Sequence, residues 1–157
     1  MPRRSYKKNK AEIEPVYKSI EVTKLINYII EDGKKSVAER IVYDVLDRLN
    51  KETQDGLKTL RQAIQNVAPI HEVKPRRLGG ASYLVPTEVR MERKLYLSLN
   101  WIINAAKTRP NKEYHTFSDK LYAEIQDATK NQGAAIAKKL QTEKLAEANK
   151  ALSHLKW

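Results

Sequence analysis

The chain has 157 residues, of which 41% are hydrophobic, so it is long enough to form one domain with its own core. It carries 30 Lys and Arg against 19 Asp and Glu, which gives a net charge of +11. This imbalance favours a polyanionic partner without specifying a fold. The lack of cysteine excludes disulfides, thiolate catalysis and cysteine-based zinc sites, and no apolar run approaches a membrane span. We therefore expect a soluble, cytoplasmic protein without a signal peptide.

Residues 1–18 are predicted to form a basic N-terminal arm. The first ten residues contain no acid and five basic side chains, which are Arg3, Arg4, Lys7, Lys8 and Lys10. Such a segment has too little apolar surface to fold alone. It is either a solubilising tail or an arm that becomes ordered on nucleic acid, and the charge of the whole chain favours the arm.

Residues 19–157 are predicted to form a single, mainly α domain of about six helices. Apolar stripes at helical spacing, which include Ile20 and Val37, place the first helix at about 19–32 and the second from Ser36 onward. Gly33 is expected to cap the first helix, and Ser36 with Glu39 is expected to form a capping box for the second.

The remaining helices are predicted at residues 57–67, 92–108, 116–131 and from about 135 to 153. Lys34 and Lys35 precede the second helix, where free backbone N–H groups and lysines suit a phosphate. The alternative is an ordinary exposed loop.

Between the third and fourth helices, residues 70–90 predict a protruding two-stranded β-hairpin. Gly79-Gly80 separates two extended runs, and glycine accepts the positive φ of tight hairpin turns. Pro75 and Pro86, one in each arm, cannot donate ladder hydrogen bonds, which favours a ribbon of two edge strands over a wider sheet. A two-stranded ribbon is marginal in water, so this one must be anchored at its base.

The ribbon and its exit are basic. They carry Lys74, Arg76, Arg77, Arg90, Arg93 and Lys94 against three glutamates. Arg76 and Arg77 lie beside the glycine turn, where a projecting arm would meet a groove. The alternative is a solvated hairpin with basic decoration, and the charge of the rest of the chain favours a nucleic-acid contact.

The sequence contains no recognisable catalytic constellation. His71, His115 and His154 are far apart and lack metal-ligand spacing. The P-loop, dinucleotide-binding, nucleophile-elbow and zinc-protease motifs are all absent from the sequence. We therefore expect no enzymatic activity, no cofactor and no metal.

Spaced motifs run nearly from one end of the chain to the other. They are Met1-Pro-Arg-Arg4, Asp32-Gly-Lys-Lys-Ser-Val-Ala-Glu39, Arg76-Arg-Leu-Gly-Gly-Ala81, Glu88-Val-Arg90, Ala146-Glu-Ala-Asn-Lys-Ala151 and the terminal Trp157. In this order and at this length, the chain resembles the bacterial-type small-subunit ribosomal protein seven family, whose members nucleate the head of that subunit. Lys139, Leu140 and Glu143 depart from this pattern, because the family tends to have Arg, an acid and His there.

The resemblance implies a structural RNA-binding protein and not an enzyme. It implies direct binding to ribosomal RNA in the 3′ major domain, and a ribbon near the exit site. Its partners there would be transfer RNA, messenger RNA and neighbouring proteins of the head and platform, with no membrane. The runner-up from the residues alone is an architectural DNA-binding protein with a basic β-ribbon arm.

Carried onto this chain, the resemblance implies RNA contacts at Arg3, Arg4, Lys34, Lys35, Arg76, Arg77, Arg90, Arg93 and Lys94. The charge pattern adds Lys7, Lys8, Lys10 and Lys74 to these RNA-binding candidates. The tip that would face the exit site comprises Arg76, Arg77, Leu78, Gly79, Gly80, Ser82 and Tyr83.

Overall fold

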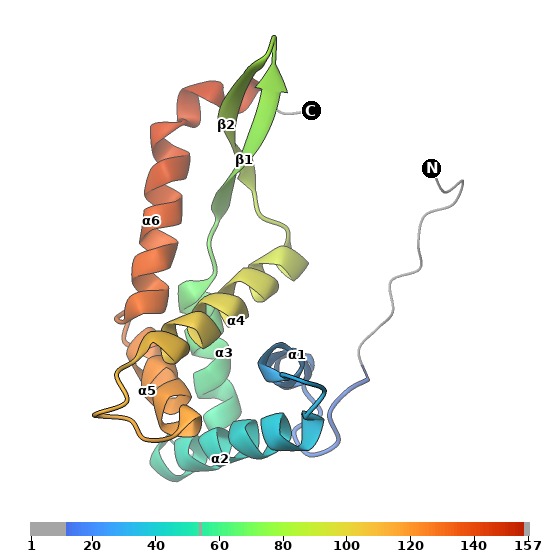
Figure 1. The fold of residues 1–157 in the computed structure, drawn as a ribbon, viewed down its shortest axis with the longest axis vertical. Coiled ribbons are helices and arrows are strands. Elements are labelled where there is room, and N and C mark those ends of the chain that lie inside the picture. The colour runs from blue at the N-terminus through green and yellow to red at the C-terminus, as the bar shows by residue number, and fades with distance from the viewer. Residues whose placement is uncertain (1–11, 54, 156–157) are drawn as a thin grey trace.

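The computed structural model describes residues 12–53 and 55–155, which form six α-helices, one 3-10 helix and one two-stranded sheet (Figure 1). In chain order the elements are α1 (Ile20–Ile29), α2 (Lys35–Thr53), α3 (Gly56–Val67), β1 (His71–Leu78), β2 (Ala81–Glu88), α4 (Met91–Thr108), α5 (Phe117–Thr129), α6 (Ala134–Ala148) and the 3-10 helix η1 (Lys150–Leu155). The predicted mainly helical fold, with a ribbon between the third and fourth helices, is confirmed.

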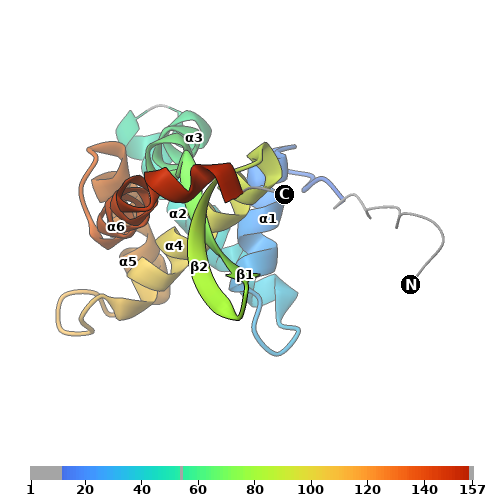
Figure 2. The ribbon, with the colours of Figure 1, turned by 90° about the horizontal axis from the view of Figure 1, so that it is seen from above.

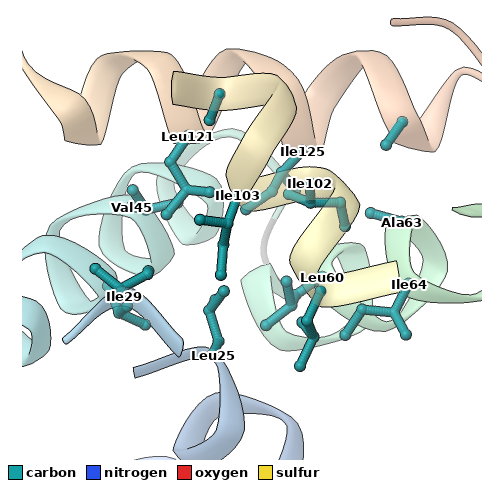
Figure 3. Close-up of a cluster of buried hydrophobic side chains, with 14 of the residues drawn as sticks. Leu25, Ile29, Val45, Leu60, Ala63, Ile64, Ile102, Ile103, Leu121 and Ile125 are labelled. Carbon is teal, nitrogen blue, oxygen red and sulfur yellow. The ribbon is translucent and has the colours of Figure 1, made fainter. Parts of the chain in front are cut away.

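The hydrophobic core lies where helices α1 to α5 meet. Figure 3 shows side chains from several helices converging there, among them Leu25, Leu60, Ile102, Leu121 and Ile125. Each of these five side chains exposes 1% of its surface or less. Because burying one such side chain contributes about 1.5–3 kcal/mol, this contact between helices is the main source of stability.

A core substitution tests this packing. Ile102→Ala should lower the free energy of unfolding by about 2–5 kcal/mol, because it removes a fully buried side chain and leaves a cavity. Ile41→Ala is the matched control, since Ile41 is only partly buried at the edge of the core and should cost less. Urea unfolding measures both, and equal losses would contradict the packing described.

The junction between the first two helices differs from the sequence prediction. α1 ends at Ile29, and the chain turns at Asp32 and Gly33, whose φ angles are 54° and 72°. Gly33 is therefore a turn residue and not a helix cap. α2 begins at Lys35, so Ser36 lies inside the first turn and does not cap the helix.

Two residues assigned to apolar stripes are not in the core. Ile20 and Val37 expose 51% and 49% of their surface. Both stand in the first turn of a helix, at the margin of the packed region.

Glu14 holds the segment before α1 against the helical body. Its carboxylate accepts hydrogen bonds from the backbone N–H of Val16 (2.8 Å) and Tyr17 (2.7 Å) and from the Tyr43 hydroxyl (2.5 Å). Its own N–H donates to Thr23 Oγ1 at 2.9 Å. The chain from Glu14 onward is thereby tied to α1 and α2.

A buried ion pair joins α4, α5 and α6. Arg109, which follows α4, donates from Nε and Nη2 to Glu124 Oε2 in α5, at 2.8 and 2.6 Å. The other carboxylate oxygen accepts from the N–H of Ala135 in the first turn of α6, at 3.0 Å. Gly133 has φ of 93°, and a Cβ there would lie 2.9 Å from that oxygen. Only glycine therefore fits this junction without a shift.

The ribbon rises from the body with α6 running beside it (Figure 1). α6 packs on β1, and η1 packs on β2 after the chain turns at Asn149 (Figure 2). The single last helix predicted to reach residue 153 is thus divided at residue 149. The ribbon is supported from one side, and Val85, Pro86 and Val89 in its lower half are buried.

Candidate nucleic-acid interface

The tip of the ribbon presents its two arginines to opposite faces. The antiparallel register pairs Arg76 with Tyr83 and Arg77 with Ser82, and neighbouring side chains on a strand alternate between faces. Arg77 is exposed, whereas Arg76 is partly buried on the face that it shares with Val85. The backbone of Leu78 pairs with Ala81 and closes the ribbon.

The turn itself is the predicted tight hairpin. Gly79 and Gly80 have φ of 55° and 88°, the left-handed conformation that glycine adopts without strain. Residues 81–84 on the second strand are all exposed. The tip therefore offers its backbone and side chains to a partner without disturbing the core.

Three basic residues gather on one face at the start of α4. Arg90 is the N-cap, and its carbonyl accepts hydrogen bonds from the N–H groups of Arg93 and Lys94, both at 2.9 Å. Residues three and four positions apart on a helix lie on one face. In the described part of the chain, Arg77, Arg90 and Lys94 form no salt bridge, so their charges are available to a polyanion.

Glu72 lies inside this basic region. Its side chain is buried on β1, forms a salt bridge with Lys74 Nζ at 3.2 Å and accepts a hydrogen bond from Arg93 Nε at 3.3 Å. Arg93 also stacks over the Tyr96 ring, 5.0 Å from its centroid. Two of the predicted RNA-binding cations thus share one carboxylate of the ribbon.

Lys34 and Lys35 lie apart from the tip. Figure 1 places the α1–α2 junction at the end of the body away from the ribbon tip. Figure 2 places the junction and the ribbon tip on the same side of the body. Each lysine has an acid 3.7 Å away, Asp32 for Lys34 and Glu39 for Lys35. Such exposed pairs contribute little, so phosphate can replace the acid. The arm residues Arg3, Arg4, Lys7, Lys8 and Lys10 lie outside the described residues.

A groove with a volume of about 600 Å³ adjoins the basic start of α4. It runs between α1, α3 and α4, has apolar side chains such as Ile70 and Met91 in its lining, and is edged by Lys24, Arg61 and Lys94. The sequence alone does not distinguish Lys24 and Arg61, because each is one charge among many on a helix face. Only the packing of α1 and α3 beside α4 brings them to Lys94.

The described structure offers no metal site at its histidines. Among the described residues, no three side chains of His, Cys, Asp or Glu are placed to hold a metal ion. His154 lies in η1 with its Nδ1 2.9 Å from the Ala151 carbonyl oxygen.

None of the described helices has the length and apolar character to cross a membrane.

The fold and the charge define a class of protein. A basic, mainly helical domain carries a ribbon with an exposed arginine at its tip, and further basic residues continue onto the helix that the ribbon enters. A basic stripe of this kind is the electrostatic footprint of a nucleic-acid-binding protein.

The sequence comparisons give the family. A family model described as "Ribosomal protein S7p/S5e" matches residues 1–150. Three relatives named "Small ribosomal subunit protein uS7" align over the whole of both chains, at 48% identity in Desulforudis audaxviator, 47% in Thermodesulfovibrio yellowstonii and 46% in Moorella thermoacetica. The chain belongs to the ribosomal protein S7p/S5e family.

Proposed function

We propose that this chain is a structural constituent of the small ribosomal subunit. It binds ribosomal RNA in the 3′ major domain, organises the head, and presents its ribbon near the exit site to transfer RNA and messenger RNA. It works in the cytoplasmic ribosome beside other proteins of the head and platform, and its role is structural and not catalytic. Membership of the family and the names of its full-length relatives support the ribosomal part of this proposal.

One observation carries the RNA-binding part: the cations Arg77, Arg90 and Lys94 have no acid partner in the described part of the chain. A protein that neutralises phosphates with such groups releases condensed counterions, and this release drives binding. Lys74 and Arg76 add positive charge on the face of the ribbon opposite Arg77, and Arg93 adds positive charge at the start of α4. The arm and the Lys34–Lys35 turn add separate contacts, so the protein can hold several RNA segments at once.

Recognition should depend mainly on shape and backbone. The deep major groove of A-form RNA resists reading by side chains, so contacts to phosphates and 2′-hydroxyls dominate. A rigid helical body with separated basic contacts fixes the relative position of the RNA segments that it touches. This is how a protein without catalytic groups can organise a junction.

Competition binding tests the proposal against a DNA-binding alternative. One labelled sample of the protein is titrated with folded head-domain RNA and with duplex DNA of equal length at the same salt concentration. We expect preference for the folded RNA. Equal affinity for both would show that charge alone drives binding, and preference for the duplex would identify an architectural DNA-binding protein.

Removing the ribbon tip should separate stability from function. The register allows Arg77 to Ser82 to be replaced by Asn-Gly, because Arg76 and Tyr83 then close the turn as a hydrogen-bonded pair, as Leu78 and Ala81 do in the unsubstituted ribbon. Because the buried part of the ribbon lies below this point, the melting temperature should stay nearly unchanged. The loss should appear in contacts with RNA ligands near the exit site, measured as initiation or reading-frame fidelity in reconstituted subunits.

Two results would contradict this role of the tip. A large fall in melting temperature would make the tip part of the folded core. Intact stability with abolished binding to head-domain RNA would instead place the main ribosomal RNA site on the tip.

A further inference from the structure

The root of the ribbon is fixed on one side by Glu72. Glu72 is 8% exposed, and its carboxylate accepts from Arg93 Nε in the first turn of α4 at 3.3 Å. Arg93 lies over the Tyr96 ring, and Tyr96 meets Tyr28 of α1 edge to face with ring centroids 5.6 Å apart. Glu72 thereby connects the first strand to α4 and, through the aromatic pair, to α1.

The other side of the root is fixed by α6. Glu143 Oε1 accepts from the N–H of Ile70, the residue before β1, at 3.1 Å. One turn earlier, Lys139 Nζ donates to the carbonyl of Asn66 near the end of α3 at 2.8 Å. The Asn66 side-chain amide in turn donates to the carbonyls of Ala128 and Thr129, both at 3.0 Å. The connection from α3 to β1 is thus held along α6.

We propose that Glu72 and Glu143 are positioning residues that fix the direction in which the ribbon leaves the helical body. Glu72 acts on the α4 side and Glu143 on the α6 side. The charge of Glu72 is what singles it out. An acid among RNA-binding cations weakens phosphate binding, so its presence there indicates a different role. The effect on RNA affinity rests on the proposed RNA-binding function. The contacts of Glu72 and Glu143 that orient the ribbon, called the ribbon mount below, exist in the free protein.

The length of the ribbon makes the position of its tip sensitive to small rotations at its root. A strand of 8 residues spans roughly 27 Å at about 3.4 Å per residue, so a rotation of about 20° at the root moves the tip by about 9 Å. Hydrogen bonds to phosphate tolerate far less than this displacement. A loose root would therefore scatter the tip arginines even if every RNA-contacting residue were intact.

Distance measurement between two spin labels tests the ribbon mount directly. The chain has no cysteine, so Ser82→Cys near the tip and Asn104→Cys on the exposed face of α4 give one defined pair. Double electron–electron resonance then reports the distribution of tip-to-body distances in the full-length protein without RNA. We expect the distribution to shift or broaden by about 5 Å or more in Glu72→Gln and in Glu143→Gln.

Glu88→Gln is the matched control. Glu88 is an exposed acid on β2 with no salt bridge among the described residues, so this change removes the same charge from the same ribbon. Its distance distribution should match that of the unsubstituted protein. Arg93→Gln breaks the Glu72 contact from the α4 side and should broaden the distribution even if Glu72→Gln does not fold.

RNA affinity provides a second readout with an informative sign. Loss of an acid alone should strengthen binding, so Glu88→Gln should bind head-domain RNA up to about threefold better than the unsubstituted protein. Glu72→Gln should fail to gain affinity or should lose it, because the tip is no longer positioned. A gain in Glu72→Gln equal to that in Glu88→Gln would overturn the proposal.

The distance data decide independently of RNA. Superimposable distributions for Glu72→Gln, Glu143→Gln and Arg93→Gln would show that these contacts do not orient the ribbon. Equal broadening in Glu88→Gln would also overturn the proposal. If the unsubstituted protein failed to bind RNA but the spin-label distances changed as expected, the proposed function would be rejected. The inference that Glu72 and Glu143 orient the ribbon would still hold.

Discussion

Replacing Arg109 with alanine should lower the free energy of unfolding by about 3–5 kcal/mol. The guanidinium gives two hydrogen bonds to Glu124, whose side chain is 1% exposed, and also contacts Asp127. Without Arg109, a buried carboxylate keeps the N–H of Ala135 as its only other hydrogen bond in the described structure. Removing one partner of a buried pair is costly because the remaining charge then has neither water nor a counter-ion beside it.

Arg48→Ala is the control for this substitution. Arg48 also bridges two acids, at 2.9 Å from Asp44 and 2.5 Å from Asp119, but its side chain is 40% exposed. Solvent screening limits such a pair to about 0–1 kcal/mol. Urea unfolding at pH 7 gives both values, and similar losses for Arg48 and Arg109 would show that burial of Glu124 does not determine the effect.

RNA affinity should fall by about 10³-fold or more between about 50 and 200 mM salt, if six or more phosphates are neutralised. Part of this dependence should come from the N-terminal arm. Deleting residues 1–10 should flatten the slope of log affinity against log salt by about 0.7–0.9 for each phosphate that the arm neutralises.

A full-length control separates the charge of the arm from its length. Glutamine at positions 3, 4, 7, 8 and 10 keeps the chain length and removes five positive charges. It should flatten the slope as much as the deletion does. An unchanged slope in both variants would leave the arm as a solubilising tail.

Local patterns predicted most of the fold. The apolar spacing along the helices and the Gly79-Gly80 turn depend on residues close in sequence, and the structure confirms both. The break after α6 could not be read in this way, because η1 packs on β2, which is distant in sequence.

A capping box opens α5 (Phe117–Thr129). Thr116 accepts from the N–H of Asp119 at 3.2 Å, and the Asp119 carboxylate accepts from the N–H of Thr116 at 3.1 Å, which completes a capping box. Thr-x-x-Asp at the start of a helix is a recognised form of this pattern. At Ser36 the similar Ser-x-x-Glu pattern fails, because α2 already begins at Lys35.

The candidate interface was predictable as a set of charges but not as an arrangement. The sequence places Glu72 and Lys74 two residues apart and Arg93 just after the hairpin. It does not show that one buried carboxylate contacts both cations. It also shows Arg109 as one more basic loop residue, whereas the structure turns its side chain inward to Glu124. Pairing of this kind depends on tertiary packing, which charge counting does not include.

The central claim is that RNA binds the surface formed by the ribbon and the start of α4. The direct test compares the salt dependence of RNA affinity for Arg77→Gln/Arg90→Gln/Lys94→Gln with that for Lys51→Gln/Lys58→Gln/Lys112→Gln. Both triple variants remove three positive charges from exposed or partly exposed positions without a described salt bridge. We expect the first variant to lower the slope by about 2–3 and the second to leave it nearly unchanged. Equal slopes for the two variants would contradict the claim, because net charge and not this surface would then determine binding.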